Sequence, residues 1–394
     1  MKLLLSNITI GKWRIPVPVF LWFLLTALAA IAEIARGEIN NYKIYTGVFE
    51  HTIKQLNLYS EYPAEYFDTN HYGPLFSIVI APFAWMPAAI GCFLWCIVNA
   101  VILLYAIRQL SLTPKQRNLI LLIALVEMMT AIHNVQFNVM LTGWMLLSFV
   151  LVEEENDFWA AFFIVMGLLT KIYGVAGIAF FCFSKHKVKF VLSFAFWLVV
   201  LVCLPMVISS PAFVIQSYQD WYQSLVEKNE QNTSTIAPKL AQDISVMGMI
   251  SRSFSINEMN NLFVLAPAAL LHALPFLRFK QYKHVAFRIT FLCMALVSVV
   301  IFSSSAESPT FVIAVTGIAT WYVIQDGMKP ALKNALVFFV LLLTCLSATD
   351  LFPAYVRNHY IRPYSLKALP CFVVWCVMAW QMLFKDFGRR NEAV

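Results

Sequence analysis

The chain has 394 residues, of which 60% are hydrophobic and 12% charged, and its mean hydropathy is +0.73. Soluble domains are about 45–50% apolar and about 25% charged. The composition therefore excludes a water-soluble globule, a disordered tail and a DNA-binding domain, because a chain this apolar needs lipid as its solvent. The net charge of +7 does not indicate nucleic-acid binding, since the basic residues are dispersed in small clusters between apolar runs.

The eight cysteines all lie inside apolar runs. A disulfide or zinc framework would place them in loops at set spacings, so we interpret them as small apolar packing residues. The sequence also lacks a P-loop, a dinucleotide glycine fingerprint, an HExxH pair and a nucleophile elbow. We therefore predict no metal and no cofactor.

Long apolar runs recur along the chain from Val17 onward. A spanning helix needs about 20 mostly apolar residues, and about twelve runs approach this length. The runs at 158–170 and 173–184 are short, and form either two helices or one kinked helix. A shorter run at 74–87 predicts a re-entrant or interfacial helix. The twelve runs are 17–35, 90–108, 118–132, 139–152, 158–170, 173–184, 190–208, 261–277, 285–303, 309–325, 332–348 and 365–384.

The charges orient this predicted bundle. Most basic residues fall in short segments on the side of both chain ends, which is the pattern of cytoplasmic loops. A full crossing by 74–87 would reverse this bias. We therefore predict one all-α, polytopic membrane domain over 1–394 in the cytoplasmic (inner) membrane, with cytoplasmic N- and C-termini. The long outer loops, which we expect to form the active-site face, are 36–73, 209–260 and 349–364.

The first outer loop is rich in Tyr, Asn, Asp and His. Aromatic rings suit the C–H face of a sugar, and amides and carboxylates suit its hydroxyl groups. For the tyrosines alone, an interfacial aromatic belt is the favoured explanation. Asp68 and His71 lie close together beside the Gly73-Pro74 break, which favours a functional role for this pair.

Polar residues also occur where the chain turns between spans. His133, Asn134, Gln136 and Asn138 exceed what a tight turn requires, although Asn138 also suits a helix cap. Glu127 lies inside a predicted span, where a carboxylate is functional, paired, or protonated and packed.

Lys171 stands alone between two apolar runs on the predicted outer side. An ammonium there is costly unless it meets an anion such as phosphate, or snorkels to the lipid headgroups. Glu307 is the only charge in the short turn 302–310. Its carboxylate suits orientation of hydroxyl groups or pairing with Lys171 or Arg252, whereas Ser308 and Pro309 suit the start of a helix.

Taken in order, these residues resemble glycosyltransferase family 87, the DUF2029-like membrane mannosyltransferases of the GT-C class. The similarity covers most of residues 17–325, and its individual motifs are short. The motifs that carry it are Asn41-Tyr42-x-x-Tyr45, Leu58-Tyr59, Tyr72-Gly-Pro-Leu-Phe76, Ala81-Pro-Phe-Ala-x-x-Pro87, Asn134-x-Gln136-x-Asn138 and Leu169-Thr-Lys171-Ile-Tyr173.

The resemblance implies a GT-C-like fold and transfer of a hexose, typically mannose, from a polyprenyl-phosphate sugar. The acceptor is lipid- or glycan-linked and lies outside the cytoplasmic membrane. Inversion at the anomeric carbon requires a base for the acceptor proton and groups that hold the leaving phosphate. The positions that match the family are Tyr42, Tyr45, Tyr59, Asn134, Gln136, Asn138 and Lys171.

Asn41 departs from the family, which often has Asp there as the candidate base, and an amide cannot accept the proton. Either the base has moved, or the activity has changed. We take Asp68 as the first candidate base, Glu307 as the second, and Glu38 as another. The predicted binding residues are Asn41, Tyr42, Tyr45, Tyr59, His71, Asn134, Gln136, Asn138, Lys171, Arg252 and Ser308.

Two other hypotheses remain. A transporter or flippase of lipid-linked glycans tends to show repeated halves and polar sites at the bilayer midplane. An inactive relative that binds glycan lipids is compatible with Asn41. For the glycosyltransferase, the expected partners are a polyprenyl-phosphate sugar, a lipid- or glycan-linked acceptor and membrane lipids, without nucleic acid.

Overall fold

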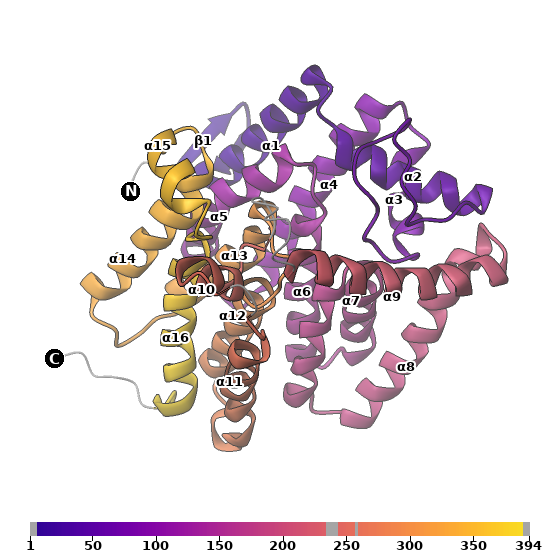
Figure 1. Ribbon diagram of the computed structural model, residues 1–394. Coiled ribbons are helices and arrows are strands. Elements are labelled where there is room, and N and C mark those ends of the chain that lie inside the picture. The colour runs from indigo at the N-terminus through magenta and orange to yellow at the C-terminus, as the bar shows by residue number, and fades with distance from the viewer. Residues whose placement is uncertain (1–5, 234–242, 257–258, 389–394) are drawn as a thin grey trace. The chain divides into compact units, whose positions relative to one another are not determined.

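The computed structural model in Figure 1 describes residues 6–233, 243–256 and 259–388, and it is mostly helical. The chain forms two compact units. Unit 1 comprises residues 1–112 and 131–229, and unit 2 comprises 113–130 and 230–394. Each unit has its own polar cluster, described below.

Unit 1 opens with a β-hairpin. β1 (Asn7–Ile10) and β2 (Trp13–Pro16) pair antiparallel, and Gly11 in the turn has a φ of 59°, which glycine adopts without steric cost. α1 (Val17–Arg36) follows directly and ends at Gly37, whose φ of 74° closes the helix C-terminus. The all-α prediction did not include this hairpin, because strands of 4 residues leave little pattern outside the apolar runs.

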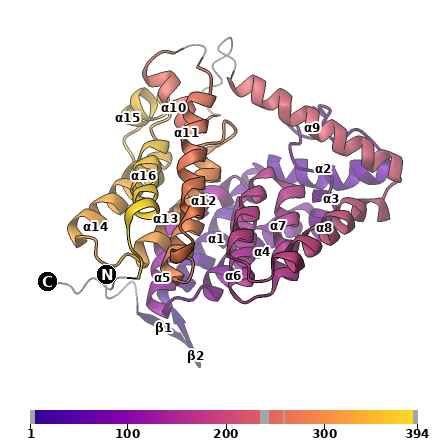
Figure 2. The same ribbon diagram turned by 90° about the horizontal axis from the view of Figure 1, so that it is seen from below.

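In unit 1, α4 packs against α1, α3 and α6, and α7 packs against α6, α8 and η2. α1 lies against α4, where the indole of Trp22 donates to the carbonyl of Ala100 at 3.0 Å, and α6 covers another side of α4. Figure 2 shows α9 running along the side of this unit that carries α2 and α3. The bounds are α2 (Asn40–Lys54), α3 (Phe76–Ala84), α4 (Ala88–Gln109), α6 (Asn138–Glu153), α7 (Asp157–Thr170), η2 (Ile172–Phe183), α8 (Lys187–Cys203), η3 (Leu204–Val207) and α9 (Pro211–Thr233), whose last residues belong to unit 2.

α7 and η2 show whether the runs at 158–170 and 173–184 form two helices or one kinked helix. The backbone of Lys171 is extended (φ −149°, ψ 120°) and separates the α-helix from a 3₁₀-helix that packs back against it. The two legs touch at glycines, since a Cβ on Gly174 would lie 2.2 Å from the carbonyl carbon of Gly167. The runs at 158–170 and 173–184 are therefore two helical segments rather than one kinked helix.

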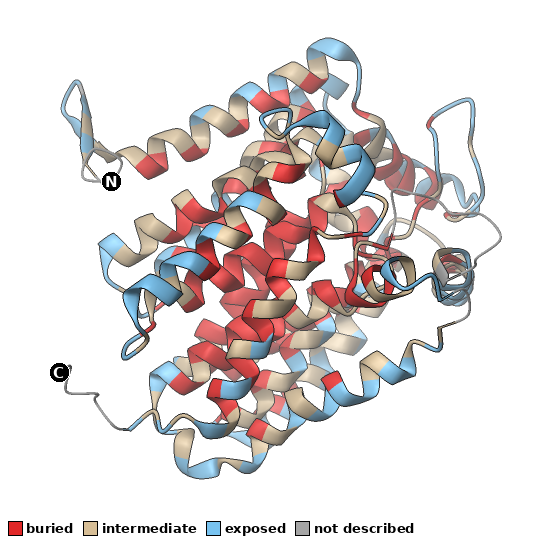
Figure 3. Cartoon of the chain, turned by 60° about the vertical axis from the view of Figure 1, so that its left-hand side comes forward, coloured by how far each residue is buried: buried red, intermediate tan, exposed pale blue. Residues whose placement is uncertain are grey.

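Unit 2 is built around α12, whose side chains are mostly buried and which contacts both α13 and α16. Figure 3 shows how far each segment is buried. The bounds are α5 (Pro114–His133, in this unit as far as Thr130), α10 (Val246–Ser253), α11 (Leu262–Ala273), η4 (Leu274–Leu277), η5 (Phe279–Gln281), α12 (Val285–Ile301), η6 (Ser308–Thr310), α13 (Phe311–Val323), α14 (Pro330–Phe339), the π-helix η7 (Val340–Cys345), η8 (Leu346–Ala348), α15 (Ala354–Val356), the π-helix η9 (Arg357–Ile361) and α16 (Ala368–Phe384).

Each apolar run coincides with helical structure. By length and composition four helices of the described residues can cross a membrane, at 17–36, 88–109, 187–207 and 330–348. The other apolar helices are shorter, so the count of about twelve spans stays a prediction. α3 has 9 residues and a proline inside, about 14 Å of helix, which is too short to cross and agrees with the non-crossing assignment of 74–87.

Candidate active site

Lys171, at the junction of α7 and η2, is the centre of the polar cluster in unit 1. Its ammonium donates to Oδ1 of Asn138 at 2.8 Å. It also lies 5.3 Å from the ring centroids of Tyr72 and Tyr173. These contacts hold the ammonium by an amide oxygen and two aromatic faces, both of which stabilise a cation. We call Lys171, Asn138, Tyr72 and Tyr173 the Lys171 centre.

Tyr72 joins this centre to the first outer loop. Its hydroxyl donates to Oε1 of Gln136 at 3.1 Å and lies 3.1 Å from the hydroxyl of Tyr45. The hydroxyl of Tyr59 donates to the backbone carbonyl of Tyr72 at 3.1 Å. The structure thus brings together five of the predicted binding residues: Tyr45, Tyr59, Gln136, Asn138 and Lys171. Tyr72 itself was not among the predicted binding residues, because the sequence shows it only as part of a motif before a Gly-Pro break.

The loop reaches Lys171 because it docks on the end of α7. The amide of Gly73 donates to the carbonyl of Thr170 at 3.0 Å. A Cβ at Gly73 would lie 2.0 Å from the carbonyl oxygen of Leu169, so only glycine permits this approach. The side chain of buried Asn70 bonds both backbone groups of Tyr72, at 3.1 and 2.9 Å, and fixes the turn.

His71, a predicted site residue, packs against α9 in surroundings that favour its neutral form. The indole of Trp221 donates to its carbonyl at 3.0 Å, and its Nδ1 lies 3.3 Å from the hydroxyl of Ser224 on α9. Burial and the positive charges of Lys228 and Lys171 lower the pKa of His71 from 6.5 to about 4, against the opposing charge of Asp68. The imidazole is therefore neutral at pH 7.

Lys228 was not predicted as a site residue. It is buried, and it follows Ser224 by one turn of α9, so it lies on the helix face that contacts His71. A lysine in a polar stretch carries no signal in the sequence, and only the packing of α9 on the loop reveals it.

The candidate bases of unit 1 are both exposed. Asp68 has a φ of 70°, and its Oδ1 accepts from the amide of Thr69 at 2.8 Å. Glu38 lies just beyond the end of α1. Of the two, Asp68 is electrostatically coupled to His71 and so lies closer to the polar cluster.

Asn41 and Tyr42 have structural partners. The amide of Asn41 donates to the carbonyl of Asn134 at 2.7 Å, a bond that an aspartate could not make. The hydroxyl of Tyr42 donates to the carbonyl of Phe83 at 2.9 Å, and burial raises its pKa. Nearby, buried Glu33 accepts from Nδ1 of His133 at 2.7 Å, a pair that was not predicted.

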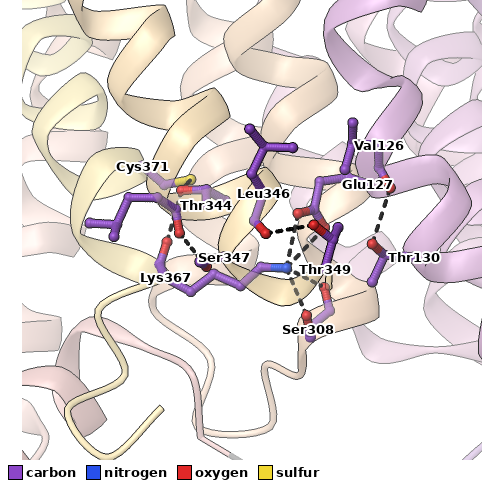
Figure 4. A network of polar contacts seen from close by, with 11 residues as sticks. Val126, Glu127, Thr130, Ser308, Thr344, Leu346, Ser347, Thr349, Lys367 and Cys371 are labelled. Atoms are coloured by element: carbon purple, nitrogen blue, oxygen red, sulfur yellow. Dashed lines mark hydrogen bonds and ion pairs between the residues drawn. The ribbon is translucent and has the colours of Figure 1, made fainter. Parts of the chain in front are cut away.

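Unit 2 holds a second polar cluster, drawn in Figure 4. Lys367 donates to both oxygens of Glu127, at 2.9 and 3.1 Å, and to the hydroxyl of Ser308 at 2.7 Å. Glu127 and Lys367 are 0% and 4% exposed. Of the alternatives for Glu127, the structure shows the paired one, and its partner was not predicted.

The other predicted residues of unit 2 flank this pair. Arg252 donates to the hydroxyl of Ser365, which donates in turn to the carbonyl of Asp243 at 3.2 Å. Glu307 is half-buried and forms a capping box with Thr310 at the start of η6, a capping role that was expected of Ser308 and Pro309 and not of Glu307. Asp68 and Glu307, the first two candidate bases, thus belong to different units.

Comparison with family models identifies a family for this chain. The model of a family described as glycosyltransferase family 87 matches residues 70–304, more than half of the chain. The matched stretch begins in the loop at Asn70 and includes the polar turn, the Lys171 centre and Arg252. No curated protein matches.

Proposed function

The chain belongs to glycosyltransferase family 87, and we propose from this membership that it transfers a hexose, with mannose as the first choice, from a polyprenyl-phosphate sugar. The acceptor is a lipid- or glycan-linked hydroxyl on the extracytoplasmic side of the membrane. The protein is a glycosyltransferase with membrane-type helices. The donor, the sugar, the acceptor and the GT-C-like architecture are our proposals.

The observation that carries this proposal is the Lys171 centre. Sugar transfer breaks the bond between the anomeric carbon and a phosphate oxygen, and negative charge develops on the phosphate as it leaves. A cation that the fold already holds in place stabilises that charge without having to reorganise during the reaction. Lys171 meets an amide oxygen and two rings, and Lys228 adds a second positive charge beside His71.

The remaining roles follow from chemistry. Asp68 takes the proton of the acceptor hydroxyl while the new carbon–oxygen bond forms, and polyprenyl phosphate departs. Neutral His71 is a hydrogen-bond partner for sugar or acceptor rather than a cation. Tyr45, Tyr59 and Gln136 form the polar and aromatic lining. Arg252, Ser308 and Glu307, in unit 2, are the second candidate set.

Direct assay of the full-length protein in detergent tests the proposal. Given polyprenyl-phosphate mannose and an acceptor, the wild type should release polyprenyl phosphate. Asp68→Asn should lower kcat by about 10²–10⁴, the usual contribution of a general base. Lys171→Met should lower kcat/KM, whereas Lys43→Met, at an exposed lysine of α2, is the matched control.

Each outcome assigns a function. Full turnover by an Asp68→Asn, Glu307→Gln double variant would contradict both base assignments. Transfer in detergent, where there is no second compartment, decides against the transporter or flippase. Donor binding without turnover would identify an inactive glycan-lipid-binding relative, in which Asn41 serves only to hold the carbonyl of Asn134.

A further inference from the structure

A cavity of about 510 Å³ lies in unit 1, where the hairpin meets α1 and the end of α4. Its volume is within the range of small-molecule sites, roughly 300–1,000 Å³. Figure 3 shows the exposed hairpin at the start of α1. Its lining includes Arg14, Arg108, Val19, Phe20, Phe23 and Leu24.

The polar part of this cavity carries one sign of charge. Arg14 comes from β2 and Arg108 from the last turn of α4. No carboxylate is among its lining residues, and neither guanidinium forms an ion pair with any part of the chain that the structure describes. Two cations at one site favour an anion, and arginine forms paired hydrogen bonds with phosphate oxygens.

The rest of the wall is apolar and follows a helix axis. Val19, Phe20, Phe23 and Leu24 recur at intervals of three and four, so they form one face over the first two turns of α1. Leu24 is 39% exposed, so this face is open at its far end. A small hydrophilic anion would leave the face uncovered, whereas an acyl chain would cover it.

Arg14 and Arg108 lie at the same end of the helix pair formed by α1 and α4. α1 and α4 are both long and apolar enough to span a membrane, and they pack against each other. Arg14 precedes the start of α1, and Arg108 lies at the end of α4, which places both at the same end of the pair. That end is the one that the charge distribution assigns to the cytoplasm.

We propose that this cavity binds one anionic phospholipid. Its phosphate lies between Arg14 and Arg108, and one acyl chain runs along Phe20, Phe23 and Leu24. A basic pocket at the cytoplasmic end of membrane helices with an apolar wall beneath it matches both parts of such a lipid. The site is separate from the Lys171 centre and does not depend on the proposed transfer reaction.

The full-length protein is purified and placed in nanodiscs of phosphatidylcholine, with or without phosphatidylglycerol. Native mass spectrometry then counts the lipid that stays bound. We expect the wild type to retain phosphatidylglycerol in preference to phosphatidylcholine. In an Arg14→Ala, Arg108→Ala double variant, the ratio of retained phosphatidylglycerol to retained phosphatidylcholine should fall about tenfold, because charge-assisted contacts to the phosphate are lost.

Controls separate charge, folding and ligand source. Arg14→Lys, Arg108→Lys should keep part of the preference, and Arg362→Ala, at an exposed arginine elsewhere, should keep all of it. An unchanged thermal midpoint in phosphatidylcholine shows that the double alanine variant is folded. The proposal fails if the wild type shows no preference, or if the double alanine variant keeps it. Displacement by millimolar inorganic phosphate, or stronger retention of polyprenyl phosphate, would also overturn it.

Discussion

His71 is an acid-sensitive point of the fold. Its pKa is about 4 in the folded protein against 6.5 for a free imidazole, because of burial and the charges of Lys228 and Lys171. Between these two values the unfolded chain binds more protons than the folded one, so stability is full above about 6.5 and falls as the pH drops toward 4. Well above 6.5 the imidazole is uncharged in both states and contributes no pH dependence.

His71→Gln should therefore reduce the loss of stability in acid. The measurement is the thermal midpoint of the detergent-solubilised protein between pH 7.5 and 4.5. Lys228→Met removes a neighbouring positive charge, so the pKa of His71 should rise and the sensitive window should narrow. His359→Gln, at an exposed histidine, should leave the profile unchanged. An unaltered acid profile in His71→Gln would contradict this account.

Single site residues could be predicted from the sequence where a polar residue lies among apolar neighbours. Lys171 and the polar turn were predicted because charge and amides are rare between apolar runs, and the structure brings them together. Lys367 could not be assigned to Glu127, because 240 positions separate the two and periodicity reports only local order. Lys228 lies in a polar stretch where nothing marks it. The catalytic role of Asp68 stays a prediction.

The helices themselves were predicted where an apolar run was long. α2 was missed because it buries one face, which includes Tyr42, Tyr45, Val48 and Phe49, and exposes a polar one, so it does not form an apolar run. α9 and α10 were likewise included in a predicted outer loop. The break between α7 and η2 was left open, because composition does not report the close contact of Gly167 and Gly174.

The pair of Glu127 and Lys367 ties α5 to the segment that precedes α16. Removal of one partner leaves a buried charge uncompensated, which costs about 3–5 kcal/mol. Glu127→Gln and Lys367→Met should each destabilise unit 2 strongly, whereas the double variant should recover most of the loss. Unfolding in increasing SDS measures this. Additive effects of the two substitutions would contradict the coupling.

At the scale of the molecule, the side of the membrane on which each loop lies is a prediction of charge distribution. Ser60→Cys, in the first outer loop, should react in intact cells with a membrane-impermeant maleimide. Ser111→Cys, in a predicted cytoplasmic segment, should react only after permeabilisation. Both are made with Cys203→Ser and Cys376→Ser, which remove exposed thiols.

The reverse labelling pattern would place residues 36–73 in the cytosol. It would contradict the proposal that donor and acceptor bind on the extracytoplasmic side. Composition predicted a membrane protein and its helical class, and the family match agrees. The division into two units carries no mark in composition, because neither a linker nor a change of residue usage separates them.

Because η2 is a 3₁₀-helix, it is nearly as long as α7, against which it packs. A 3₁₀-helix seldom extends beyond one turn, whereas η2 has 12 residues. Because a 3₁₀-helix rises about 2.0 Å per residue, η2 is about 24 Å long. This length is close to the roughly 21 Å of the 14 residues in α7. An α-helical winding of the same residues would reach only about 18 Å. A substitution that rewinds this leg would thus shorten it by about 6 Å and shift its far end, at Phe183, along α7.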